Sequence, residues 1–189
     1  VVLDLSHRFT DTYMRKVRSR MSEVAEKYEG VPSVMVTLTL DPSLYESKWD
    51  MWLTIKKDLH RFMINVRNHF ESKGRAAPKY IATIEAMKGQ AKNDYVAKGN
   101  PHIHVVFLGV RRVADIKVME RRWWKCGHVD VDKTPDKRKV RHPIKYVTKY
   151  ITKTFSAYKK EWSLNQSLVW FFGVRSYTCS RGLVRPLNS

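Results

Sequence analysis

Residues 101–108 read Pro-His-Ile-His-Val-Val-Phe-Leu, and this stretch decides the fold. Its β-branched and aromatic residues predict a β-strand over 102–108. Because successive side chains of a strand point to opposite sides, His102 and His104 share one face, and Ile103, Val105 and Phe107 share the other. The stretch therefore predicts a half-buried strand that carries two imidazoles on one face.

The rest of the chain mixes strand patterns with helix patterns. Alternating or β-branched residues predict further strands over 34–40, 80–87, 128–131 and 177–179. Apolar residues at three-and-four spacing, with Gly and Pro at the ends, predict helices over 11–29, 48–72, 113–125, 143–158 and 168–172. This order predicts an α+β domain with a central antiparallel sheet of four to five strands and flanking helices.

Composition limits the class of protein and points to its partner. The chain has 189 residues, which is the size of one domain, and its 43% hydrophobic content is enough for a packed core. No apolar run reaches the length of a membrane span, and two cysteines exclude a disulfide framework. The 36 Lys and Arg against 18 Asp and Glu give a net charge of +18, which favours a nucleic acid over a membrane as the partner. A basic surface that serves only solubility or heat stability is the alternative.

The ends of the sequence bear on domain organisation. The chain starts at Val1 without a methionine, so we expect a fragment or processed form of a longer replication protein, with residues 1–189 as a single domain. The apolar start is too short for a signal peptide, and the acidic Asp4 follows at once. We expect a cytoplasmic protein, and we interpret the polar stretches 89–100 and 130–141 as loops.

A metal site is the first candidate for chemistry. His102 and His104 can bind one ion from one face of their strand, although an isolated His-x-His is more often a pair of surface histidines. The strand over 80–87 should pair antiparallel with the histidine strand and can bring Glu85 beside the imidazoles. Two histidines and one carboxylate leave coordination positions open, as catalytic ions need. Glu85 as a plain solvent-facing charge, or as a partner of Lys88, remains an alternative.

A pair of tyrosines is the second candidate. In the helix predicted over 143–158, Tyr146 and Tyr150 are one turn apart and fall outside the apolar stripe that faces the core. Each is followed three residues later by a lysine, Lys149 and Lys153. The two rings could pack under another segment or stack on bases. Either hydroxyl could also be a nucleophile if a cation, a base or a metal ion helped it.

These segments together resemble the HUH endonucleases, specifically the rolling-circle replication initiators of plasmids and single-stranded DNA phages. The chain matches three family motifs in order: Val36-Thr37-Leu38-Thr39, Pro101-His102-Ile103-His104, and a doubled Tyr-x-x-Lys in Tyr146-Val147-Thr148-Lys149-Tyr150-Ile151-Thr152-Lys153. The doubled tyrosine is similar to the two-tyrosine branch, and the motifs span residues 33–155. The resemblance implies a ferredoxin-like nuclease domain.

The resemblance also implies an activity and its cofactor. One strand of origin DNA would be nicked by Tyr146 or Tyr150, which leaves a 5′-phosphotyrosine link and a free 3′-hydroxyl, and later rejoined. His102, His104 and Glu85 would hold Mg²⁺ or Mn²⁺, and Lys149 and Lys153 would orient the phosphate or neutralise the phenolate. The host's replication helicase and polymerase would be partners, in a prokaryotic cell. Candidates for DNA contact are Thr37, Thr39, Arg111, Arg112, Arg121, Arg122, Trp123 and Arg141.

Three other functions remain open. An HUH transposase or relaxase uses related chemistry, but relaxases usually carry three metal histidines and small transposases one tyrosine. A non-catalytic nucleic-acid-binding module would form no covalent product. A metal-dependent hydrolase that uses water would still cleave DNA without its tyrosines.

Overall fold

A computed structural model describes residues 10–87, 98–132, 143–153, 164–175 and 177–184. The predicted helix segment after residue 153, the tip of the 89–100 loop and Arg141 lie outside these residues. The elements are, in chain order, α1 (Asp11–Lys27), β1 (Ser33–Leu40), the short 3-10 helix η1 (Pro42–Leu44), α2 (Lys48–Glu71), β2 (Lys79–Ala86), β3 (Pro101–Leu108), α3 (Ile116–Val118), the π-helical turn η2 (Met119–Trp123), β4 (Gly127–Asp132), α4 (Pro143–Lys153), α5 (Leu164–Phe171) and β5 (Thr178–Cys179).

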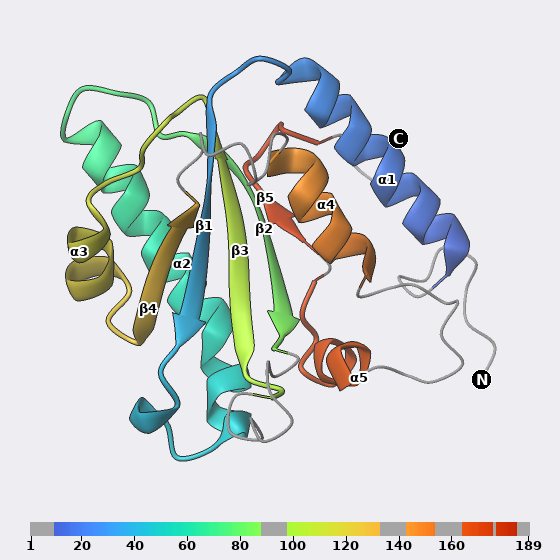
Figure 1. Cartoon of the computed structure of the whole chain (residues 1–189), viewed down its shortest axis with the longest axis vertical. Coiled ribbons are helices and arrows are strands. Elements are labelled where there is room, and N and C mark those ends of the chain that lie inside the picture. Colours follow the sequence, from blue (N-terminus) through green and yellow to red (C-terminus); the bar gives the residue numbers. More distant parts are fainter. Residues whose placement is uncertain (1–9, 88–97, 133–142, 154–163, 176, 185–189) are drawn as a thin grey trace.

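The strands form one open antiparallel sheet in the order β4-β1-β3-β2-β5 (Figure 1). Strand β3 lies between β1 and β2, so the connection from β1 through α2 to β2 crosses over β3. The order of β1–β4 is that of the ferredoxin-like fold, in which two β-α-β units interlock. The prediction of an α+β fold with a five-stranded antiparallel sheet is confirmed.

Helix α2 covers one face of the sheet. Its start is fixed by Ser47, whose side chain accepts a hydrogen bond from the Asp50 backbone N–H at 3.2 Å and donates one to the Asp50 carboxylate at 2.6 Å. Its buried residues, among them Trp52, Ile55 and Phe62, pack with the strand residues of this face. That face is lined by Val34, Val36, Leu38, Leu40, Ala82, Ile84, Ile103, Val105 and Phe107. The larger of the two apolar cores therefore lies between α2 and the sheet.

Helices α1 and α4 pack on the opposite face. Figure 1 shows α4 beside β2 and β3, with α1 lying over it. This second core joins the apolar stripes of the two helices to the strand residues behind them. Its buried members are Val17, Met21 and Val24 of α1, Ile144, Val147 and Ile151 of α4, and Met35, Ile81, Val106, Leu108 and Leu183. The stripe predicted for α4 is thus the surface by which this helix is attached to the sheet.

The segment 113–125 differs from the single helix that was predicted. Asp115 caps a helix that starts only at Ile116, and the chain then passes into the π-helical turn η2 and ends at Trp124. Trp124 is fully buried and its indole N–H donates to the Thr39 carbonyl at 3.0 Å, which requires the chain to leave the helix there. Within the part of the chain that the structure describes, no helix is long and apolar enough to cross a membrane.

Candidate metal centre

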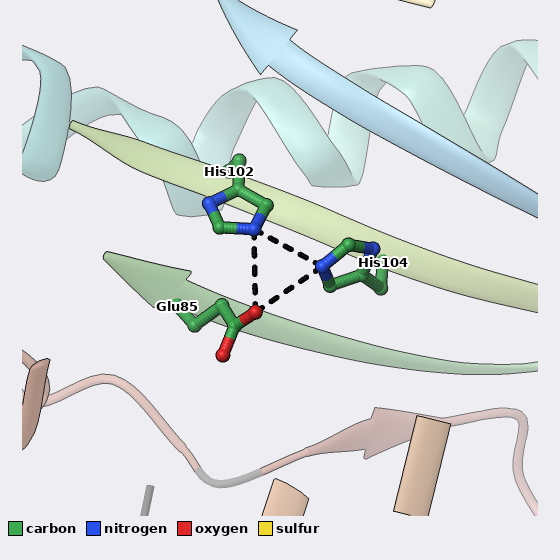
Figure 2. A group of neighbouring side chains, drawn as sticks. All are labelled: Glu85, His102 and His104. Atoms are coloured by element: carbon green, nitrogen blue, oxygen red, sulfur yellow. Dashed lines mark hydrogen bonds and ion pairs between the residues drawn. The ribbon is translucent and has the colours of Figure 1, made fainter. Parts of the chain in front are cut away.

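The pairing of β2 with β3 brings three potential metal ligands together. Glu85 lies directly opposite His102 in the ladder, and His104 follows two residues along β3 on the same side. The His102 Nε2 atom lies 3.0 Å from His104 Nε2, and each of these nitrogens lies 3.3 Å from Glu85 Oε1. Figure 2 shows the two rings and the carboxylate pointing toward one another. These three side chains could hold one metal ion.

The surroundings keep the Glu85 side chain ionised. Burial alone would raise the pKa of Glu85, which is 6% exposed. Hydrogen bonds from His102 and His104, together with their charge, outweigh burial and lower the pKa of Glu85 to about 2. A buried carboxylate between two imidazoles is a site of negative charge that a cation can neutralise. Two nitrogens and one carboxylate oxygen are a donor set that suits divalent metals and leaves positions open for substrate, so the residues fit such an ion.

Bonds on the far side of the two rings differ. The His104 Nδ1 atom lies 3.1 Å from the Thr37 hydroxyl of the neighbouring strand β1. His102 Nδ1 is buried and has no hydrogen-bond partner among the residues that the structure describes. Metal-binding histidines usually hold their second nitrogen in a hydrogen bond that fixes the ring. Thr37 therefore positions His104, a role that the sequence analysis missed when it expected Thr37 to contact DNA.

The sheet face that carries the candidate metal centre is divided in two. One half is apolar and covered by α1 and α4. The other half carries two polar rows across four strands, according to the pairing of Cα positions. One row is His128, Thr39, His102 and Glu85, and the next is Asp130, Thr37, His104 and Thr83. The metal ligands thus belong to a polar strip that reaches the edge strand β4, where His128 and Asp130 are exposed.

The tyrosine helix lies on the same face as the ligands. Helix α4 carries Tyr146 and Lys149, and the backbone positions of Tyr150 and Lys153, beside β2 and β3. Lys149 is exposed, whereas Tyr146 is partly buried and packs against the second core. The prediction placed Tyr146 away from the core stripe. The difference arises because α4 is covered by α1 as well as by the sheet, so more than one stripe of the helix is enclosed.

The basic candidates for DNA contact lie elsewhere. Arg111 and Arg112 are exposed just after β3, and Arg112 pairs with Asp115 at 2.8 Å. Arg121 and Arg122 are exposed on η2, whose Met119 belongs to the core on the α2 side of the sheet. This is the side opposite the metal ligands, so these arginines are not brought together with them.

The neighbouring tryptophans have separate environments. Trp123 is partly buried and makes edge contacts with Phe62 and His69, with ring centroids 6.1 and 5.1 Å apart. Trp124 is fully buried. Core packing, which the sequence left as an alternative to base stacking, is therefore the role of Trp124.

The fold and the His-His-Glu group are those of a Rep-like protein of the HUH class. Residues 33–155 match the family model of the replication-associated protein ORF2, so the chain belongs to this family of replication-associated proteins. No curated protein and no solved structure matches the chain. The matched region begins at β1 and ends just after α4, so it includes all three ligands and both tyrosines.

Proposed function

We propose that this chain is a catalytic domain that initiates rolling-circle replication by nicking single-stranded origin DNA and later rejoining it. The observation that carries the proposal is the Glu85-His102-His104 group on β2 and β3, on the sheet face that also holds helix α4. Membership of a replication-associated family and the net charge of +18 support DNA as the substrate.

The three ligands would hold Mg²⁺ or Mn²⁺. A divalent ion bound there supplies positive charge that polarises the scissile phosphate and offsets the charge that develops on it. His102 and His104 bind through Nε2, with Thr37 holding the His104 ring from behind. The adjoining polar strip offers a floor on which a strand of DNA can lie.

One tyrosine of α4, Tyr146 or Tyr150, would be the nucleophile. Its phenol oxygen forms a bond to phosphorus while the bond from phosphorus to the 3′ oxygen breaks. The phenol proton leaves, and the departing oxygen takes up a proton to become a 3′-hydroxyl. The result is a 5′-phosphotyrosine link that conserves the phosphodiester bond for rejoining. Lys149 and Lys153 would stabilise the phenolate or orient the phosphate.

The spacing of the tyrosines suits two successive transfers. Residues four apart lie on one side of a helix, about one turn from each other. A second tyrosine can therefore attack the same kind of phosphate after one round of copying. The first link is then released to the new 3′-hydroxyl, which closes a circle.

A gel that resolves covalent protein–DNA species tests the proposal. The wild-type chain with Mn²⁺ and labelled single-stranded origin DNA should give a species that survives denaturation, and EDTA should abolish it. Tyr146→Phe/Tyr150→Phe should bind the DNA as wild type does and form no such species. Tyr158→Phe is the matched control, because it removes a phenol outside the doubled motif. Cleavage that persists in the double variant would instead indicate a hydrolase that uses water.

A further inference from the structure

An exposed group of apolar rings lies where helices α2 and α5 meet. Trp49 of α2 is 51% exposed and Phe171 of α5 is 63% exposed, and their ring centroids are 5.0 Å apart at 61°. Phe172 lies beneath them, 4.9 Å from Trp49 and 5.1 Å from Phe171. Leu53, one turn after Trp49, is 56% exposed. We call Trp49, Leu53 and Phe171 the aromatic patch.

The rings of the aromatic patch are held in place from below. Phe172 stacks on the buried Trp52 with ring centroids 5.6 Å apart and planes inclined by 15°. Two large rings side by side on a fixed base cost little conformational entropy when they bind a flat partner. Large apolar rings that remain exposed on a supported base mark an interaction surface rather than a packing defect.

Lysines border the aromatic patch. The Lys56 ammonium donates to the Phe172 carbonyl at 3.2 Å, and the Lys48 ammonium donates to the Lys98 carbonyl at 2.7 Å. Lys48 precedes Trp49, and Lys56 lies one turn beyond Leu53. The acid of the same helix turn, Asp50, already accepts a hydrogen bond from Ser47. The surface therefore combines stacking rings with positive charge.

The helices that carry the aromatic patch are bonded to the strand ends that carry the metal ligands. Ala86, the residue after Glu85, donates its backbone N–H to the Asn165 side-chain oxygen of α5 at 2.7 Å. The Trp52 indole N–H of α2 donates to the Gly99 carbonyl at 2.9 Å, just before β3 begins. Asn165 and Phe171 are about 9 Å apart along the axis of α5. A strand that leaves the metal ligands at this end of the sheet meets α2 and α5 next.

We propose that the aromatic patch binds unpaired bases of the DNA strand that flanks the cleavage site, by stacking on Trp49 and Phe171. The inference rests on the proposed function, because it assigns the path of the substrate strand away from the reacting phosphate. Single-stranded DNA matches the surface in both respects, since bases stack on the rings and phosphates pair with Lys48 and Lys56. Duplex DNA does not, because its bases are already stacked.

Binding of oligothymidylate to a variant without the rings tests this proposal. Trp49→Leu/Phe171→Leu keeps the apolar character and removes both π-faces, and both sites are exposed enough for the fold to persist, which circular dichroism would check. Fluorescence anisotropy in EDTA would compare a 24-nucleotide oligothymidylate with an abasic strand of the same length. Leu44→Ala is the control, because Leu44 is 58% exposed on η1, outside the aromatic patch.

We expect the double variant to lose about tenfold or more in affinity for oligothymidylate, the scale of one or two stacked bases, and to bind the abasic strand as wild type does. Equal losses on both strands, or unchanged affinity, would overturn the proposal. So would a wild-type self-association in sedimentation that the variant abolishes while oligothymidylate binding stays intact, since the surface would then join copies of the chain. Because the assay needs no metal and no cleavage, it can fail or succeed independently of covalent adduct formation.

Discussion

The hydroxyl of Thr37 lies 3.1 Å from Nδ1 of His104, across 67 positions of sequence and from the neighbouring strand. For Nε2 of His104 to bind a metal ion, its lone pair must be free, so the proton sits on Nδ1 and is donated to Thr37 Oγ1. The bond therefore selects the tautomer that a metal ligand needs and fixes the plane of the ring.

Thr37→Val should weaken metal binding without disturbing the fold. Valine has the shape of threonine but no hydroxyl, and loss of such an outer hydrogen bond typically costs about 10- to 100-fold in metal affinity. Titration calorimetry with Mn²⁺ measures the effect, and Thr37→Ser should restore most of it. Thr39→Val is the matched control on the same strand face, opposite His102 in the ladder. Equal affinities in Thr37→Val and wild type would show that Thr37 does not position the ring.

Bound metal should raise the melting temperature through Glu85. An ion at about 100 times its Kd adds about 2.7 kcal/mol to the free energy of unfolding, which is a rise of about 5–10 °C for a chain of this size. Glu85→Gln removes the ligand charge and should abolish the rise, as seen by scanning calorimetry with Mn²⁺. His128→Ala should keep the rise, because His128 lies in the same polar row outside the three ligands. A shift that survives in Glu85→Gln would place the ion elsewhere.

Gly127→Ala should destabilise the protein by about 3 kcal/mol or more. A Cβ atom at Gly127 would meet the Thr39 carbonyl oxygen and the Asp41 backbone nitrogen, so strand β4 could not keep its place beside β1. Urea denaturation measures the loss. Gly30→Ala provides the comparison, since Gly30 has φ +70° and open space around it, and conformational strain alone should cost about 1 kcal/mol. Similar losses in the two variants would argue against the steric reason.

The two adjacent tryptophans should differ in their effect on stability. Trp124→Phe removes the hydrogen bond to the Thr39 carbonyl and leaves space in the core, so it should cost about 3 kcal/mol. Trp123→Phe keeps a ring against Phe62 and His69 at a partly exposed site and should cost about 1 kcal/mol or less. Urea denaturation followed by circular dichroism measures both. The reverse order would mean that Trp123 is the core residue.

The Cys126 thiol should react slowly at pH 8. Burial, together with the nearby Asp58 charge, raises the pKa of Cys126 from 9.0 to about 11, so the thiolate fraction falls about a hundredfold. The raised pKa contributes stability that is fully present below pH 9 and is lost as the pH rises toward 11. Labelling with a chromogenic disulfide reagent from about pH 7 to 11 checks this, with Cys179→Ser to isolate one thiol. Labelling at the rate of a free thiol at pH 8 would contradict it.

Local patterns predicted most of the fold, and long-range pairing explains what they missed. The strands and long helices follow from side-chain periodicity, which burial enforces in every turn or pleat. The adjacent Trp123 and Trp124 suggested a continuing helix, whereas the bond of Trp124 to Thr39 ends it. Helix α5 starts at Leu164 rather than at residue 168, where Asn165 reaches back to the end of β2. Neither partner is visible from local sequence.

The candidate metal centre was predictable only in part for the same reason. Alternation along β3 placed His102 and His104 on one face, but the long loop before β3 left open which residue of β2 would lie opposite them. The ladder sets Glu85 against His102, which makes the group. The role of Thr37 depends on β1 being the other neighbour of β3, and hence on the order of the whole sheet.

The two halves of the proposed active site are built in different ways. Glu85, His102 and His104 are fixed by the hydrogen-bond ladder of two adjacent strands, whereas α4 is attached to the sheet by the apolar side chains Ile144, Val147 and Ile151. Apolar contacts are non-directional, so they constrain the rotation and translation of a helix less strictly than a ladder constrains its strands. We expect evolution to vary the number and placement of nucleophiles on this helix freely while the ligand geometry stays constant.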